Sequence, residues 1–177
     1  MRIAILRRSW SFDVHPTSLP LDQLLGECRE IRTRRSGPGG QHRNKVETAV
    51  VLTHQGSGIS AEASERRSQD ANRKVALERL RRRLALKIRG RFSGTPSARW
   101  QSRASGRRLS VSETHLDFAP LLAEALDALT ALNWDVGATA EALEVSPSQL
   151  TKFIARDAEA FVLLNSERQQ RGLRPLR

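Results

Sequence analysis

The 177-residue chain carries 30 lysines and arginines against 19 aspartates and glutamates, a formal net charge of +11. Hydrophobic residues make up 38% of it, enough for one ordinary domain or two small ones, which excludes a fully disordered chain. The charge predicts a polyanionic partner, either nucleic acid or an anionic membrane surface. No run of 18 apolar residues is present, and the apolar stretch after Met1 is too short for a signal peptide. We therefore expect a cytoplasmic protein that does not insert into a membrane.

The charge is divided unevenly along the chain. Residues 1–109 hold 24 Lys and Arg and 9 Asp and Glu, whereas residues 110–177 hold 6 and 10. The two halves are therefore predicted to have different partners. The single cysteine, Cys28, excludes an internal disulfide, and the four scattered histidines show no metal-ligand spacing. Neither a metal nor another cofactor is expected.

The beginning of the chain is predicted to contain an arm, a helix and a strand. Residues 1–17 show no usable period, and we interpret them as an irregular arm. Leu19 to Gly26 are expected to form a short helix. The alternation from Glu27 to Arg35 predicts a strand with one half-buried face, which leads into a glycine-rich loop.

A hairpin is predicted after that loop. Thr48 to His54 is short and rich in β-branched residues, Gln55 to Gly58 supplies turn glycines, and Ile59 to Ser64 continues the extended pattern. His54 lies beside the turn. We expect it to be a surface or cross-strand histidine and not a catalyst.

A long basic helix is predicted from Ser68, a favourable N-cap, to about Arg89. Asp70 lies where the helix dipole favours negative charge. Lysines and arginines cover much of its surface, and no acid follows Glu78 within the helix, so we expect unpaired cations that contact phosphates. The apolar stripe that would cover the sheet consists of Leu77, Leu80, Leu84 and Ile88.

The chain then changes character twice. Residues 90–110 contain five arginines and no acid, with glycine and serine, and are predicted to be a basic linker. Trp100 within it is expected to pack against a neighbouring domain and not to stack on a base. Residues 111–177 are rich in Ala, Leu and acids and predict an acidic, all-α module.

The acidic module contains a pattern that resembles a helix-turn-helix. It spans Gly137 to Ile154, with Ser146 capping the second helix and Pro147 at its first position. Glu144 stands where a glycine often makes the turn, which puts a standard turn geometry in doubt. A final helix is expected over about Asp157 to Arg171. We interpret the module as a helical cap or a protein-docking domain.

The most informative stretch is the loop that follows the first strand, RRSGPGGQHRNK at residues 34–45. Its glycines let the backbone approach a ligand more closely than a Cβ would allow, and the cations around them predict an RNA-facing element. This loop and the later sequence ERRSQDAN, residues 65–72, resemble the catalytic domain of class I peptide chain release factors. The chain is most similar to the short, codon-independent ribosome-rescue members, over residues 18–89.

The resemblance implies an α+β fold: a small GGQ domain of a strand, the GGQ loop, a β-hairpin and a long basic helix. In this chain the helix-turn-helix-like all-α module would follow it. The resemblance also implies an enzyme, a peptidyl-tRNA hydrolase that cleaves the ester between nascent peptide and P-site tRNA in the ribosomal peptidyl transferase centre.

Gly39, Gly40 and Gln41 match the reactive motif of that family. Gln41 cannot accept a proton at neutral pH, so the chemistry must rest on positioning. The Gln41 backbone N–H would donate to the oxyanion that forms when water attacks the ester. Arg43 stands where many members have an apolar residue. The expected RNA-binding residues are Arg34, Arg35, Ser36, Gly37, His42, Arg43, Asn44, Lys45, Arg66, Ser68, Gln69, Asn72, Lys74, Arg81, Arg82 and Arg83.

Stop-codon recognition is not expected, because only 38 residues precede Gly39 and the acidic half shows no likeness to a codon-reading domain. The expected partners are large-subunit rRNA and P-site peptidyl-tRNA, with a protein partner for the acidic module; we expect a monomer and no membrane contact. Two alternatives stay open: an RNA-binding protein without hydrolysis, and a DNA-binding regulator, which the negative charge of the module disfavours. Whether the substrate is a whole stalled ribosome or a split large subunit is also open.

Overall fold

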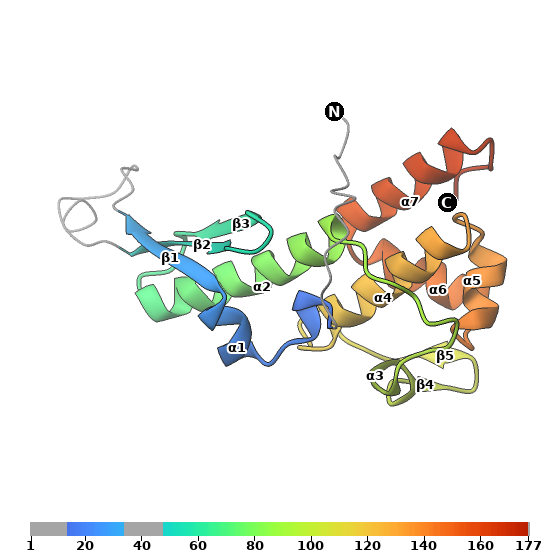
Figure 1. Ribbon diagram of the computed structural model, residues 1–177, viewed down its shortest axis with the longest axis horizontal. Coiled ribbons are helices and arrows are strands. Elements are labelled where there is room, and N and C mark those ends of the chain that lie inside the picture. Colours follow the sequence, from blue (N-terminus) through green and yellow to red (C-terminus); the bar gives the residue numbers. More distant parts are fainter. Residues whose placement is uncertain (1–13, 34–47, 177) are drawn as a thin grey trace. The chain divides into compact units, whose positions relative to one another are not determined.

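The computed structural model describes residues 14–33 and 48–176 (Figure 1). The chain forms two compact units, one of residues 16–84 and one of residues 1–15 with 85–177. The α+β architecture with a helical C-terminal region, expected from the sequence, is confirmed. Within the described residues, no helix combines the length and the apolar character needed to cross a membrane.

The unit of residues 16–84 contains a three-stranded antiparallel sheet in the order β1-β2-β3. β1 is Cys28–Thr33, β2 is Ala49–His54 and β3 is Ser60–Ala63. The predicted first strand and the predicted hairpin are thereby confirmed. Thr33 pairs with Ala49, so the chain leaves and re-enters the sheet at neighbouring positions on either side of residues 34–47.

The helices of this unit are the short α1, Leu21–Gly26, and the long α2, Gln69–Lys87. Both predicted helices are confirmed, and the Ser68 Oγ accepts a hydrogen bond from the Ala71 N–H at 3.4 Å at the start of α2. The expected irregular arm differs in its last residues, because Pro16–Ser18 forms a 3₁₀ turn in which Pro16 and Thr17 are buried. The rest of that arm, residues 1–13, lies outside the described residues.

The core of this unit lies between α2 and one face of the sheet. Val50 and Leu52 of β2 lie opposite Ala63 and Ala61 of β3, and all four are buried. All members of the predicted stripe of α2 are buried as well; Leu77, Leu80 and Leu84 belong to this unit, whereas Ile88 belongs to the other. Two arginines of α2 fix the helix to the sheet through backbone carbonyls of β3. Arg79 donates to the Glu62 carbonyl and Arg83 donates to the Ser60 carbonyl.

His54 lies in the core and not on the surface. Its side chain is fully buried, its Nε2 lies 3.0 Å from Glu27 Oε2, and its Nδ1 lies 2.8 Å from Ser57 Oγ. Ser57 N–H donates to the same Nδ1 at 3.2 Å, which makes Nδ1 the acceptor and leaves Nε2 to donate to the carboxylate. The histidine therefore links the β2–β3 turn to the residue before β1. Because His54 also lies opposite Cys28 in the sheet, the cross-strand alternative is confirmed and the surface alternative is wrong.

The unit that contains residues 85–177 is mainly helical. Its elements are α3 Ala98–Gln101, β4 Ala104–Ser105, β5 Arg108–Leu109, α4 Phe118–Ala131, α5 Val136–Ala142, α6 Pro147–Ala155 and α7 Ala158–Gln170. The central helix α4 has nearly all of its residues buried. Around it, Trp100 and Phe118 each make an edge-to-face contact with Phe153.

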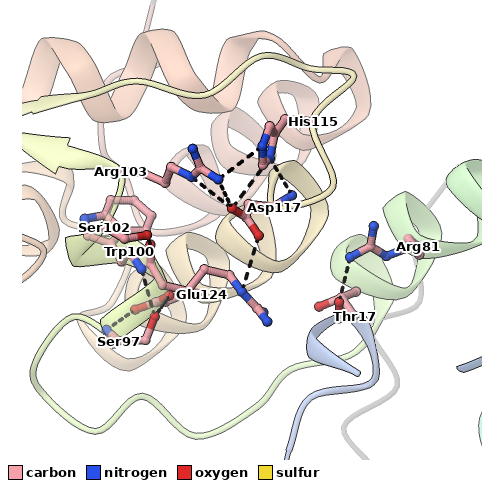
Figure 2. Close-up of polar contacts among 10 residues, drawn as sticks. Thr17, Arg81, Ser97, Trp100, Ser102, Arg103, His115, Asp117 and Glu124 are labelled. Carbon is pink, nitrogen blue, oxygen red and sulfur yellow. Dashed lines mark hydrogen bonds and ion pairs between the residues drawn. The ribbon is translucent and has the colours of Figure 1, made fainter. Parts of the chain in front are cut away.

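The basic linker predicted over residues 90–110 is instead an ordered part of this unit. Trp100 is fully buried and its indole N–H donates to the Leu143 carbonyl at 2.8 Å, so the expectation that it packs and does not stack on a base is confirmed. Ser97 caps α3 and is itself held by Glu124 of α4 (Figure 2). The linker prediction was wrong because it was based on composition. Burial of two side chains, Trp100 and Leu109, is enough to fix this polar segment to its unit.

A buried ion pair fixes the chain after α2 to α4. Arg89 and Asp127 are both buried, with 3.4 Å between Nη1 and Oδ1, and the Gly90 N–H donates to the same oxygen at 2.8 Å. Burial raises the pKa of Asp127 to about 6, although Arg89 and the Gly90 N–H favour its charged form. A Cβ at position 90 would lie 2.7 Å from Asp127 Oδ2, so any larger residue there would require this carboxylate to move.

The helix-turn-helix-like pattern is present as α5 and α6. Ser146 Oγ accepts from the Gln149 N–H and Pro147 opens α6, as predicted. Glu144 adopts the left-handed conformation, with φ of 57°, that a glycine would adopt at this turn. The turn therefore has the standard left-handed geometry that the sequence put in doubt, and the backbone of Glu144 is strained.

Replacing Glu144 with glycine should raise the free energy of unfolding by up to about 1 kcal/mol, because the left-handed conformation strains any residue with a Cβ. Chemical denaturation of the purified chain measures it. The matched control is Glu141→Gly, one turn earlier in α5, which should lower stability by about 1 kcal/mol because it places glycine inside a helix. Equal destabilisation by both changes would contradict the assignment of strain to Glu144.

Candidate functional site

The candidate reactive loop lies outside the described residues, and the structure describes its base. The predicted site residues between Arg34 and Lys45 therefore have no described geometry. These are Arg34, Arg35, Ser36, Gly37, Gly39, Gly40, Gln41, His42, Arg43, Asn44 and Lys45. The strand that enters the loop ends at Thr33, and the chain returns at Thr48, immediately before β2.

Asn72 fixes the returning end of the loop to the first turns of α2. Its side chain is fully buried, and Nδ2 donates to the Thr48 carbonyl at 2.6 Å and to the Arg66 carbonyl at 2.9 Å. Its Oδ1 accepts from the Arg66 N–H at 2.8 Å. Every polar atom of this amide is used within the protein. These contacts favour a positioning role for Asn72 over the expected RNA contact, because both of its side-chain N–H groups already donate within the protein.

The entering strand is fixed by the next residue of the same helix. Arg73 Nε donates to Glu30 Oε2 at 2.8 Å, while Arg32 Nε donates to the other carboxylate oxygen, Oε1, at 2.9 Å. Partial burial alone would raise the pKa of Glu30, but the hydrogen bonds and charges of the two arginines outweigh it and hold that pKa below its ordinary value. Consecutive residues of α2 thus hold the two limbs that flank the glycine loop.

The segment before α2 presents cations to solvent. Arg66 and Arg67 are both exposed, and neither side chain has a hydrogen bond or ion pair to any other residue within 14–33 and 48–176. Arg67 was not among the predicted site residues, although it directly follows Arg66 in the same basic pair. Ser68 is exposed and Gln69 is half-buried beside them. These residues form the described cationic surface nearest in sequence to the loop base.

The basic face of α2 is more occupied than the sequence predicts. Lys74 is exposed and pairs with Asp70 one turn earlier, at 2.9 Å. Arg79 pairs with Glu65 at 2.6 Å, and Arg83 donates to the Ser60 carbonyl at 2.6 Å. The expectation of unpaired cations is wrong for these residues, because Glu65 and the Ser60 carbonyl lie outside the helix and Asp70 lies one turn earlier within it.

Arg81 is the clearest correction among the predicted RNA-binding residues. It is only 7% exposed and donates to the Thr17 carbonyl at 3.0 Å (Figure 2). Arg82 is half-buried and Arg83 is exposed. The 3.6-residue period of the helix separates three consecutive arginines onto different faces, so they cannot act as one patch. Arg81 holds the 3₁₀ turn at Pro16–Ser18 and is not available to phosphate.

The described residues offer no metal site. No group of three or more His, Cys, Asp or Glu residues within 14–33 and 48–176 is placed to hold a metal ion. Cys28 donates through its Sγ to the Leu24 carbonyl at 3.1 Å, and burial, followed by the charge of Glu27, raises its pKa to about 11. The thiol is therefore protonated and poorly nucleophilic near neutral pH.

One long helix, α2, packs along a sheet that contains a hairpin. The glycine-rich segment connects two strands of that sheet, and α2 fixes both of them. This arrangement is that of a domain that presents a loop. The model of the RF-1 domain family matches residues 26–115, half of the chain. The chain belongs to this family, the class I release factor GGQ domain.

Curated relatives agree with that family. The chain is 39% identical over 70 residues to a peptide chain release factor homolog of Escherichia coli, which covers 40% of this chain and 34% of the relative. It is 52% identical over 58 residues to peptide chain release factor 2 of Acidovorax sp., covering 31% of this chain and 16% of the relative. It is 48% identical over 67 residues to the mitochondrial translation release factor in rescue of Danio rerio, covering 38% of this chain and 43% of the relative. Each match thus spans less than half of the relative's length.

Proposed function

We propose that this protein releases nascent peptides from ribosomes by hydrolysing the peptidyl-tRNA ester without reading a stop codon. Membership of the release-factor family supports ester hydrolysis, and the presence of Gly39, Gly40 and Gln41 in the sequence carries it to this chain. Its partners would be large-subunit rRNA and P-site peptidyl-tRNA, and its place of action the cytoplasm, where ribosomes translate.

The loop base supports a mechanism that depends on positioning. Two consecutive residues at the start of α2 fix both limbs of the loop, through Asn72 to Thr48 and through Arg73 to Glu30. A rigid base lets the Gln41 N–H meet the developing oxyanion without reorganisation during the reaction, which is where such donors are most effective. The adjacent ribose hydroxyl of the tRNA would help to move the proton, and the Gln41 side chain would shape the water site.

Codon-independent action is supported by the character of the other unit. Residues 110–177 are acidic and fold into α4 to α7, and their sequence has no likeness to a codon-reading domain. The Danio rerio relative is named a release factor in rescue. A second candidate, RNA binding without hydrolysis, would keep the fold and the cations but make no use of an intact GGQ sequence.

The test uses purified full-length chain and ribosomes that carry a labelled nascent peptide. Three complexes are compared: mRNA truncated at the P site, a stop codon in the A site, and a sense codon in the A site. We expect release from the truncated complex without a need for the stop codon. Release that requires the stop codon would overturn codon independence. Binding without release on all three would favour the non-hydrolytic candidate.

Ribosome binding should weaken with salt, and Arg66 and Arg67 should account for part of that dependence. Replacing both with glutamine should lower the slope of log affinity against log salt by about 2, since each phosphate contact contributes about 1. Sedimentation with ribosomes across a potassium chloride series measures it. The matched control, Arg79→Gln with Arg171→Gln, removes the same charge from arginines already paired with Glu65 and Glu167. An equal loss of slope in the control would show a general charge effect only.

A further inference from the structure

The hairpin β4–β5 presents an outward face that the core of its unit does not use. Leu109 is buried, whereas Ser105 and its partner Arg108 are exposed, as strand alternation requires. The Ser110 N–H donates to the Arg103 carbonyl at 2.9 Å, which extends the ladder and places these two residues on the same outward face. Arg103, Ser105, Gly106, Arg108 and Ser110 line a surface hollow there.

A second hollow shares Ser110 with the first. Ser112, Thr114 and Arg156 line its polar walls, and Glu113 is the one acid among the residues that line either hollow. The two hollows together form a track whose polar side chains, apart from Glu113, are guanidinium and hydroxyl groups. These are the donors that proteins use to bind phosphate oxygens.

The track carries positive charge at Arg108 and Arg156. The Arg156 guanidinium donates to the Val111 carbonyl, whereas the Arg108 side chain is exposed and has no hydrogen bond or ion pair to another residue in the described part of the chain. Arg103 is different, because Asp117 accepts from its Nε and Nη2 at 2.9 and 2.7 Å and His115 lies 3.1 Å from Nη2 (Figure 2). Arg103 therefore shapes the wall, and Arg108 supplies charge that no nearby carboxylate compensates.

The hairpin is held in place before any ligand arrives. The Arg107 carbonyl accepts from the Ser146 N–H at 3.0 Å, and the Arg107 guanidinium donates to the Val145 carbonyl at 3.4 Å. The tip of the hairpin is thus attached to the turn between α5 and α6. A preformed surface loses little conformational entropy on binding, which favours affinity.

The chemistry of the track favours a phosphate backbone over an acidic protein. Protein interfaces gain most of their affinity from apolar and aromatic side chains in a dry centre. The large apolar side chains exposed in the described residues are Val14, Ile31, Leu116, Val162 and Leu173, and none of them lines either hollow. None of the residues that line the two hollows is aromatic, so stacking on bases is not expected there.

We propose that the β4–β5 hairpin and the strand that follows it form a second RNA-binding surface, which holds the phosphate backbone of RNA without regard to sequence. The choice of RNA as the nucleic acid rests on the proposed ribosomal function. The phosphate contact is argued from the side chains of the track and does not depend on that function. The surface adjoins residues that are net acidic, with 6 Lys and Arg against 10 Asp and Glu over residues 110–177. It would give the helical unit a local site for rRNA.

The test is binding of a 12-nucleotide oligouridine RNA to the full-length chain. Backbone amide resonances of Ser105, Gly106, Arg108, Ser110 and Ser112 should shift on titration. Arg108→Gln should lower the salt slope of affinity by about 0.7, the value for one phosphate contact on a single strand. Arg91→Gln is the matched control, because Arg91 is exposed, has no partner within the described residues and lines neither hollow.

Three results would overturn the proposal. The first is an unshifted hairpin while other resonances move, and the second is an Arg108→Gln slope equal to that of Arg91→Gln. The third is displacement of the RNA from the hairpin by polyglutamate of the same charge and concentration, which would indicate an acidic protein partner. Oligouridine binding is measured without a ribosome or an ester, and peptide release is measured separately on ribosomes. Failure of this proposal and failure of the hydrolytic function are therefore distinguished by separate measurements.

Discussion

Gln41→Pro should lower peptide release by about 10²–10³-fold relative to Gln41→Ala, because proline removes the backbone N–H that we assign to the oxyanion. Gln41→Ala keeps that donor and should retain measurable hydrolysis. Single-turnover release from ribosomes carrying labelled peptidyl-tRNA measures both rates. The two variants share the loss of the amide side chain, so the comparison isolates the backbone donor.

Ribosome occupancy has to be equal for that comparison to hold. Sedimentation of each variant with ribosomes, at the protein concentration of the release assay, provides the control. If Gln41→Pro bound normally and hydrolysed as fast as Gln41→Ala, the oxyanion role of this amide would be untenable. The family assignment would stand, because it rests on residues 26–115 as a whole.

Asn72→Ala should lower the release rate at saturating protein by up to about 10²-fold, because misplacing a reacting group by about 1 Å can cost that much. The substitution removes three hydrogen bonds and leaves the Thr48 carbonyl and both backbone groups of Arg66 without this partner. We also expect roughly 3 kcal/mol lower stability, since each buried polar group left unsatisfied costs about 1–3 kcal/mol. Release kinetics and chemical denaturation measure the two effects.

A core truncation separates positioning from stability. Leu84 is fully buried under the sheet, away in sequence from the loop base, and Leu84→Ala should cost a similar 2–5 kcal/mol. Both variants are assayed at a temperature where denaturation shows them folded. Leu84→Ala should then release peptide at close to the normal rate. If it lost as much activity as Asn72→Ala, the asparagine would matter only for stability.

Local sequence determined most of the secondary structure. The alternation of β1, the β-branched run of β2 and the leucine spacing of α2 are periodic patterns, and each produced the predicted element. Capping signals also acted locally, as Ser146 and Pro147 do at α6. The GGQ sequence and the residues around it were sufficient to predict the family, because an ordered series of motifs needs no knowledge of packing.

The tertiary structure decided which polar side chains remain available to a ligand. Asn72 and Arg81 matched the expected RNA-binding set, yet folding brings Thr48 and Thr17 to them and uses their donors internally. Their partners lie 24 and 64 residues away, beyond the reach of any local pattern.

The linker prediction for residues 90–110 failed for the same physical reason. One tryptophan inside a polar, arginine-rich stretch is buried because Leu143 and Phe153, far along the chain, form its site. Burial of Trp100 depends on these distant residues, whereas the composition of residues 90–110 describes that segment alone. The sequence by itself therefore determined the elements and the reactive motif of this protein. Only the folded structure decided that Asn72 holds the base of the loop, that Arg81 is buried, and that Arg66, Arg67 and Arg108 face solvent.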